Sequence, residues 1–245
     1  NMYCHREPRF YLTVVWNGQW FKWENRNTNF LYGQPDGGPT HDAPQNGYLN
    51  RSRVSLDYIP RDNNHPYRPA IIFRMAEAYL SYAEALNESS ERMSHKQEIL
   101  DNLNKIRHRA GIAEYGTGTD ENGFTRIKIN FSDQKEVRRL IHKERRVEFV
   151  GEGVRYHDLR RWKTAHYGIG NLNEQGENPD WGVNGPDYGM NYYGTEYTDQ
   201  GDNAFFKRTK YMDRVYPRKF YWYPIHQSEI DKDPTLVQGP FWLGE

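Results

Sequence analysis

The chain has 245 residues and a mass of 29.2 kDa, with 33 basic and 33 acidic side chains and a single cysteine, Cys4. This charge balance argues against nucleic acid as a partner, because nucleic-acid binders carry a basic face, and one cysteine excludes an internal disulfide framework. Aromatic residues make up 15% of the chain, which argues against disorder and leaves rings that we expect to face solvent or a ligand.

The first predicted element is a β-hairpin in the aromatic-rich run at residues 9–23. Residues 9–16 are rich in β-branched and aromatic side chains, Asn17-Gly18 follows, and residues 19–23 resume the run. Asn-Gly between two such runs favours a type I′ turn, because both residues tolerate a positive φ. Residues 33–69 are rich in Gly, Pro, Asn and Asp and predict a long ordered loop.

Four helices are predicted in the middle of the chain, at about residues 70–88, 95–110, 134–149 and 154–166. In each, apolar residues recur at steps of three and four, as in the series Ile72, Met75, Tyr79. Gly111 is the predicted stop of the second helix and Gly151 breaks the third. Residues 167–219 predict another long loop, and the aromatic tail from residue 221 predicts an extended segment stapled by rings.

These elements predict a mainly α protein in which helical hairpins carry long irregular loops and a short β-hairpin. We expect the whole chain, 1–245, to be one portion of a single domain. Its parts are a hairpin and loop region (1–69), a helical core (70–166), and a loop excursion with a tail (167–245). No run approaches the roughly 20 apolar residues that a membrane helix needs. The chain starts at Asn1 without a signal sequence or lipobox, so we expect it to belong to a longer protein.

Five segments, in order along nearly the whole chain, resemble the RagB/SusD family. Residues 74–87 are similar to its R-x-A-E-x-Y-L-x-x-A-E-A helix, and residues 103–111 to its N-x-I-R-x-R-A-G helix end. Residues 144–162 are close to E-R-R-x-E-x-x-x-E-G-x-R-x-x-D-L-R-R-W. Residues 6–10 resemble a D-P-R-F segment, and residues 223–240 resemble the closing P-I-P and N-P-x-L-x-Q-N-P-G motifs, with departures at His226, Asp233 and Gly239.

The resemblance implies the carboxy-terminal half of a SusD-like lipoprotein on the surface of a Bacteroidetes outer membrane. The membrane anchor would be an N-terminal lipid that is absent from this chain, and the missing half would supply tetratricopeptide-like helix pairs. The implied partners are a nutrient oligosaccharide or polysaccharide and a SusC-like TonB-dependent transporter, over which the protein closes as a lid. No nucleic acid partner, no cofactor and no catalysis are expected.

The predicted ligand site combines aromatic platforms with hydrogen-bonding groups, because sugars offer flat C–H faces and rims of hydroxyls. Three tryptophans lie in or beside the predicted hairpin, where alternation keeps them from all being buried together. The family places part of its glycan site after the D-P-R-F-like segment, and Arg74 and Cys4 resemble positions used by a fructan-binding relative, which leans the prediction toward fructan or levan. The predicted ligand-binding residues are Cys4, Trp16, Trp20, Trp23, Asn25, Tyr32, His41 and Arg74, with Arg26 and Asn27 nearby.

The acidic residues of the helices raise the alternative of a glycoside hydrolase, which needs two facing carboxylates. Candidates such as Glu84, Glu144 and Glu148 each have an arginine within a helical turn or on a neighbouring helix. Such pairing lowers the pKa of a carboxylate, which is wrong for a general acid, so we predict structural ion-pair networks and no catalytic residue. A protein- or peptide-interaction module of a peptide importer is the other alternative.

No His or Cys spacing matches a metal site. Two loops rich in Asp and Asn, at residues 120–123 and 199–203, could hold Ca²⁺ through oxygen ligands. Both lack EF-hand spacing, so ordinary turns are favoured over an ion site.

Overall fold

The computed structural model describes residues 2–52, 54–55, 66–67, 70–168 and 182–242, so parts of both predicted long loops lie outside the described residues. The chain divides into two compact units. The first contains Asn1–Arg155 and Gly189–Thr209, and the second contains Tyr156–Tyr188 and Lys210–Glu245.

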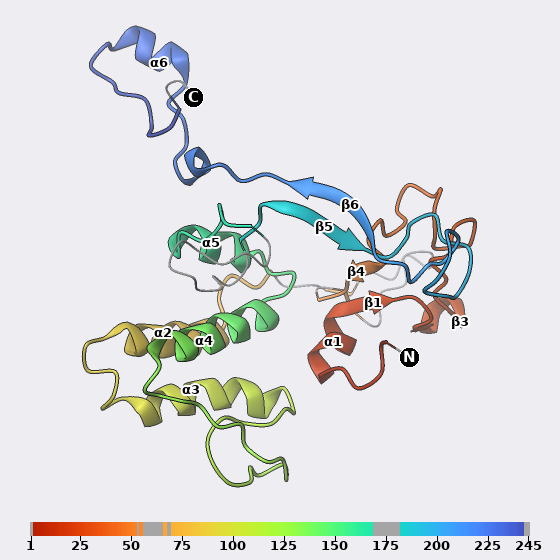
Figure 1. The fold of residues 1–245 in the computed structure, drawn as a ribbon, viewed down its shortest axis with the longest axis horizontal. Coiled ribbons are helices and arrows are strands. Elements are labelled where there is room, and N and C mark those ends of the chain that lie inside the picture. The colour runs from red at the N-terminus through yellow and green to blue at the C-terminus, as the bar shows by residue number, and fades with distance from the viewer. Residues whose placement is uncertain (1, 53, 56–65, 68–69, 169–181, 243–245) are drawn as a thin grey trace. The chain divides into compact units, whose positions relative to one another are not determined.

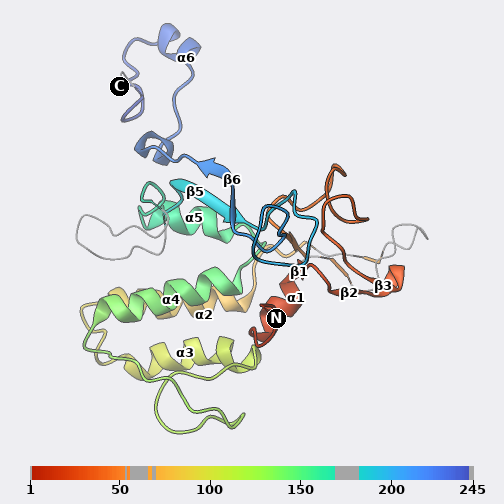
Figure 2. The ribbon, with the colours of Figure 1, turned by 45° about the vertical axis from the view of Figure 1, so that its right-hand side comes forward.

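Three helices form the helical layer of the first unit: α2 (Met75–Glu88), α3 (Lys96–Arg109) and α4 (Gln134–Glu148). In both views α2 lies beside α4 with α3 next to them (Figures 1 and 2), and α2 packs against both of its neighbours. The core between them is made of fully buried aliphatic side chains, among them Leu80, Ile99, Leu103, Val137 and Ile141. The predictions at 95–110 and 134–149 are therefore confirmed.

The first predicted helix begins later than expected, at Met75 instead of residue 70. Arg74 is extended (φ −142°, ψ 154°), and its guanidinium is held by Glu148 and Glu152. Ile72, which we predicted on the apolar face of the helix, is 96% exposed in the extended segment before it. The apolar spacing in residues 70–74 is therefore a poor guide, because the arginine contacts fix the chain in another conformation.

The hairpin predicted around Asn17-Gly18 is wrong. Pro8–Thr13 forms a helix, α1, because proline at the first helical position presets its φ. The short strand β1 (Val14–Trp16) then pairs antiparallel with β4 (Tyr48–Asn50), and β2 (Trp20–Phe21) pairs with β3 (Arg26–Asn27) beyond a 3₁₀ turn at Lys22–Glu24. The two strands on either side of Asn17-Gly18 therefore pair with different partners.

The second unit contains most of α5 (Val154–Arg161), which is shorter than the predicted helix at 154–166. It ends because Lys163 adopts a left-handed φ of 59° while Thr164 N–H donates to the Leu159 carbonyl. Strands β5 (Gly185–Gly189) and β6 (Thr209–Arg214) pair within the segment predicted as loop, which is a correction.

The tail of the second unit contains a 3₁₀ turn, η3 (Arg218–Tyr221), and a short helix, α6 (Gln227–Lys232), so it is less extended than predicted. The predicted ring staple is confirmed, because the Trp242 ring stacks on Phe220 and its Nε1–H donates to the Lys219 and Trp222 carbonyls. Within the described ranges, no helix of either unit is both long and apolar enough to cross a membrane.

Candidate functional site

A cleft of about 900 Å³ opens beside the end of β1 in the first unit. It combines rings with amides and hydroxyls, which suits a polyhydroxylated ligand. Of the predicted ligand-binding residues Trp16 lines it, and so does Asn27, which was predicted nearby. The described residues that line the cleft are Met2, Tyr3, Trp16, Asn17, Gly18, Asn27, Thr28, Asn29, Tyr197, Thr198, Asp199 and Phe206.

Trp16 is held by strand pairing and by a cluster of rings. It lies opposite Tyr48 in the β1–β4 ladder. Its indole stacks on Phe10 at 5.3 Å and 29° and meets the edge of Tyr11 at 5.4 Å. The side chain is half-buried, so packing fixes its orientation while part of the ring stays at the cleft. An indole held in this way is preorganised for stacking on a ligand.

The floor of the cleft is fixed by the buried residues Asn17 and Thr28. The Thr28 hydroxyl donates to the Trp16 carbonyl at 2.7 Å and accepts the Gln19 N–H at 3.0 Å. The Asn17 side-chain oxygen accepts the Phe30 N–H at 2.7 Å. Together with backbone bonds that join Gly18 and Gln19 to Thr28, these bonds set the path of the chain around the cleft.

The rim of the cleft joins two segments that are distant in the sequence. The Tyr197 hydroxyl, on a side chain 59% exposed, donates to the Asn29 side-chain oxygen at 3.0 Å. Asn29 is separated from it by 168 positions. Asn27, on β3, is exposed at the same cleft. No local pattern in the sequence links these residues, so sequence reasoning missed Tyr197, Asn29 and the buried Tyr3 and Thr28.

Arg26, a predicted hydrogen-bond donor, does not line the cleft and bonds to Asp36 instead. Its guanidinium donates to both oxygens of Asp36 at 2.6 and 2.8 Å, and Asp36 also accepts the Asn29 N–H. Burial alone would raise the pKa of Asp36, but Arg26 and the Asn29 N–H outweigh it and hold that pKa below its usual value. A charged Asp36 thus anchors the strand segment that carries Asn27 and Asn29.

Four other predicted residues lie on the surface outside the described lining. Trp20 is 58% exposed on β2, and Asn25 is exposed with a left-handed φ of 50°. The exposed His41 contacts Asp42, its neighbour in the sequence, and Cys4 is an exposed free thiol. Trp23 lies in the 3₁₀ turn, and its side chain falls outside the described residues.

Tyr32 packs among rings, with its centroid 6.0 Å from that of Tyr192 and 5.5 Å from that of Tyr193. The Tyr32 N–H also donates to the Gly194 carbonyl at 2.8 Å. Tyr32 therefore ties the loop after β3 to the 189–209 segment, and it does not line the cleft.

Arg74 belongs to a buried ion network that we call the arginine cluster, made of Arg9, Arg74, Arg107 and Arg109 around Glu144 and Glu148. Arg9 bridges Glu144 (2.7 Å) and Glu148 (3.0 Å), and Arg107 donates to Glu144 at 2.9 Å. Arg74 and Arg109 both bond to Glu148, and Arg74 also forms two bonds to Glu152 at 2.9 and 2.7 Å.

The arginine cluster confirms the predicted ion-pair network. Burial would raise the pKa of Glu148, but hydrogen bonds from Arg74, Arg109 and Arg9 hold it below its ordinary value of 4.5. Glu148 is therefore charged near neutral pH and unsuited to act as a general acid. Its neighbour Glu144 has both oxygens taken by arginines.

The loop considered for Ca²⁺ at residues 120–123 is a turn built on Asp120. Its carboxylate accepts three backbone N–H groups, from Glu114, Asn122 and Phe124, at 2.9–3.1 Å. In the other loop, Asp202 pairs with Lys207 at 2.9 Å. Across the described part of the chain, no group of three or more His, Cys, Asp or Glu side chains is placed to hold a metal ion.

Comparison with known proteins identifies the family. A model of the SusD family matches residues 1–242. The chain belongs to the SusD family. Two curated members from Formosa agariphila are each 32% identical to it, SusD-like protein P25 over 109 residues and SusD-like protein P38 over 103 residues. These matches cover 44% and 42% of this chain, and 18% and 19% of the two proteins.

Solved SusD-like structures share the fold. A SusD-like protein from Bacteroides fragilis is 26% identical, with a TM-score of 0.67, over 98% of this chain and 40% of its own. A second B. fragilis protein, described as a SusD-like carbohydrate-binding protein, is 24% identical, with a TM-score of 0.59, over 96% of this chain and 42% of its own. The predicted family and mainly α fold are thus confirmed, and this chain spans less than half the length of these relatives.

Proposed function

We propose that this chain forms part of a non-catalytic protein that binds a neutral oligosaccharide in the cleft beside Trp16. Membership of the SusD family supports a role in carbohydrate binding. The proposal for this cleft rests on one observation. Ring packing fixes the indole of Trp16 at a cleft that amide and hydroxyl groups also line. Its volume of about 900 Å³ lies at the upper end of the range for small-molecule sites, which leaves room for more than one sugar ring.

The ligand contacts follow from the chemistry of the lining. The Trp16 ring offers an apolar face for the C–H side of a sugar. Asn27, Asn29 and Thr198 offer donors and acceptors for hydroxyls, and Tyr197 adds an exposed ring at the rim. Because only Asp199 brings a formal charge to the described lining, a neutral ligand fits this cleft better than a polyanion.

The same lining argues against hydrolysis. The common glycosidase mechanisms need two carboxyl groups flanking the scissile bond. Asp199 is the sole carboxylate among the described residues of the cleft, and Glu144 and Glu148 are occupied by arginines. We therefore propose binding without bond cleavage.

The proposal extends to the cellular setting of the family. The family resemblance supports a lipid-anchored protein at the outer-membrane surface that passes its ligand to a SusC-like TonB-dependent transporter. The proposal includes fructan among the ligands, because Cys4 and Arg74 resemble positions that a fructan-binding relative uses. The guanidinium of Arg74 is already bonded to Glu148 and Glu152. We therefore place the ligand contacts in the cleft beside Trp16 and not at Arg74.

The proposal is tested by calorimetric titration with malto-, cello-, xylo-, manno- and levan-type hexasaccharides. We expect at least one to bind, and Tyr197→Ala and Asn27→Ala to weaken its affinity about tenfold each, or about 1.4 kcal/mol. Tyr193→Ala is the matched control, because Tyr193 is 69% exposed on the same segment but does not line the cleft.

Two outcomes would overturn the proposal. One is that no hexasaccharide binds, or that Tyr193→Ala weakens binding as much as Tyr197→Ala. The other is that new reducing ends accumulate at enzymatic rates during incubation with the bound sugar, which would establish a hydrolase.

A further inference from the structure

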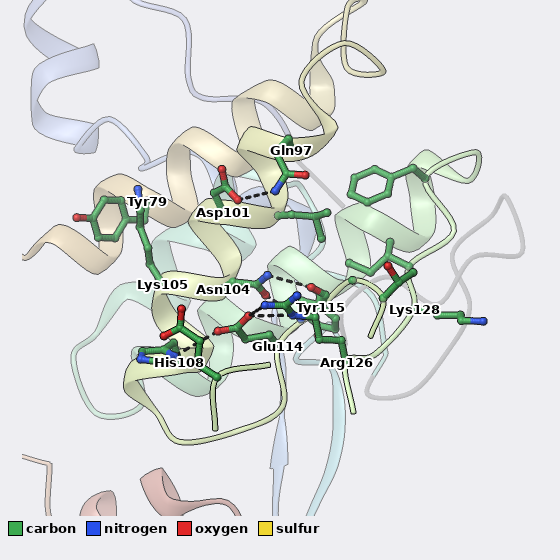
Figure 3. A pocket seen from close by; sticks show the side chains of 16 residues that line it. Tyr79, Gln97, Asp101, Asn104, Lys105, His108, Glu114, Tyr115, Arg126 and Lys128 are labelled. Carbon is green, nitrogen blue, oxygen red and sulfur yellow. Dashed lines mark hydrogen bonds and ion pairs between the residues drawn. The ribbon is translucent and has the colours of Figure 1, made fainter. Parts of the chain in front are cut away.

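A second cleft, of about 920 Å³, lies along α3 (Figure 3). The cleft is lined by a stripe of α3 side chains, by residues of the loop at 114–131 and by Tyr79 of α2. This cleft shares no lining residue with the one beside Trp16. The α3 residues that line it are Gln97, Leu100, Asp101, Asn104, Lys105 and His108.

Hydrogen bonds and ion pairs of side chains fix the loop at 114–131 in place. Asn104 donates to the Tyr115 carbonyl at 2.9 Å and accepts the Tyr115 N–H at 2.8 Å. This pair of bonds attaches the backbone of the loop to α3. The buried Glu114 accepts from Arg126 at 2.8 Å and contacts His108 at 3.2 Å (Figure 3). The cleft is therefore preorganised, which reduces the entropy that a ligand must overcome.

The charges on the lining cancel. Three cationic side chains, Lys105, Arg126 and Lys128, face three acidic ones, Asp101, Glu114 and Glu121. A ligand of either charge would thus meet groups of its own sign. A neutral hydroxyl-bearing ligand can donate to the carboxylates and accept from the cations, since each hydroxyl does both.

Several of these groups keep hydrogen-bonding capacity. Asp101 accepts from Gln97 at 2.7 Å through one oxygen, and its other oxygen has no hydrogen bond among the described residues. Lys105 lies over the Tyr79 ring at 4.5 Å (Figure 3). Within the described part of the chain, Glu121 and Lys128 form no ion pair. The apolar lining comes from Leu100, Ile129 and Phe131, which pack on the helical core.

We propose that this cleft is a second binding site for a neutral oligosaccharide, separate from the cleft beside Trp16. The stripe from Gln97 to His108 spans about 16 Å of helix, which is longer than a monosaccharide and suits a chain of sugars. The inference rests on the proposed function in taking the same class of ligand. Two sites on one unit would bind a polymer more tightly than either site alone.

Calorimetry with the same hexasaccharides tests the inference. We expect two binding events for the unaltered protein. The double variant Lys105→Ala/Glu121→Ala should weaken one event at least tenfold and leave the other unchanged, while Tyr197→Ala should do the reverse. Lys96→Ala/Glu91→Ala is the matched control, because both residues are exposed and lie outside the cleft.

The outcomes separate the two claims. A single event that Tyr197→Ala removes and Lys105→Ala/Glu121→Ala does not would overturn the second site while the proposed function stands. An equal loss in the Lys96→Ala/Glu91→Ala variant would likewise overturn it. If none of the hexasaccharides binds in any variant, both claims fail. A single event that only Lys105→Ala/Glu121→Ala weakens would support the second site and overturn the Trp16 cleft.

Discussion

The arginine cluster and the cleft beside Trp16 both gather polar side chains from distant parts of the first unit, but they use them differently. In the arginine cluster, Glu144 and Glu148 are satisfied by four guanidinium groups and have nothing left for a ligand. In the cleft, Asn27 and Tyr197 stay exposed on a backbone that buried bonds hold in place. We therefore expect ligand binding where polar groups keep unused hydrogen-bonding capacity, and not simply where many polar groups gather.

The largest expected effect comes from breaking the arginine cluster with Glu148→Gln. The Glu148 side chain is 2% exposed and charged, and removing its charge leaves three guanidinium groups without it. Breaking a buried pair costs about 3–5 kcal/mol, and we expect about 3 kcal/mol because the Arg109 side chain is half exposed. Urea denaturation measures the change in the free energy of unfolding.

Glu88→Gln is the control for that variant, because it breaks the much more exposed Arg138–Glu88 pair. Exposed pairs contribute about 0–1 kcal/mol. If Glu88→Gln lowers the free energy of unfolding as much as Glu148→Gln does, then the buried ion pairs of the arginine cluster contribute no more to stability than an exposed pair.

The same cluster predicts how stability depends on pH. The pKa of Glu148 is held below its ordinary 4.5 in the folded chain, so the unfolded chain binds the proton more readily. The contribution of Glu148 is therefore complete above its unfolded pKa and is lost as the pH falls through its folded pKa. We expect the free energy of unfolding to change little from pH 7 to pH 5 on this account and to fall below about pH 4.5. Glu148→Gln should show a shallower fall, and parallel curves would contradict the assignment.

An intermediate effect is expected when the floor of the cleft is broken. Thr28→Val removes the hydroxyl that bonds to the Trp16 carbonyl and the Gln19 N–H. The Gln19 N–H and the Trp16 carbonyl stay bonded to each other at 3.2 Å. Each lost hydrogen bond contributes about 0.5–1.5 kcal/mol, so we expect a total loss of about 1–3 kcal/mol, which thermal or urea unfolding would detect. Thr195→Val, at an exposed residue on the 189–209 segment, should change stability much less. If the two variants are equally stable, the Thr28 bonds do not fix the cleft.

The smallest effect is expected at Trp20, which the sequence suggested as a sugar platform. Its ring is 58% exposed but lies outside the described lining of the cleft. Because Trp20 would not touch a ligand in that cleft, Trp20→Ala should alter hexasaccharide affinity by no more than about twofold, or about 0.4 kcal/mol. A tenfold loss would restore Trp20 as a platform and move the site away from the Trp16 cleft.

The helical layer was predictable because its signal is local. Leu103 and Ile106, or Val137 and Ile141, lie within one helical turn of each other, so periodicity alone identifies a buried face. The ion pairs were predictable for a related reason, since each acidic candidate had an arginine nearby in the sequence or on an adjacent helix. The pairing of β1 with β4 was not predictable, because the partner strand, Tyr48–Asn50, is distant in the sequence and only three residues long.

Of the residues that line the cleft beside Trp16, the sequence suggested only Trp16 and, as a nearby hydrogen-bonding residue, Asn27. Trp16 stood out by residue type, but Tyr197 meets Asn29 across 168 positions and nothing near either residue signals the contact. Thr28 was missed because its role is to bond, through its hydroxyl, to the backbone of Trp16 and Gln19. Composition does not predict such a role.

The bonds from Arg9 to Glu144 and Glu148 close a loop of more than 130 residues. Such closure is entropically costly, whereas α2 and α3 follow each other directly and can meet early. We therefore expect the segment around α1 to dock last during folding and to open first on the native protein. In hydrogen exchange, amides of the Pro8–Thr13 helix should exchange before those of α3, although both end at the same carboxylates.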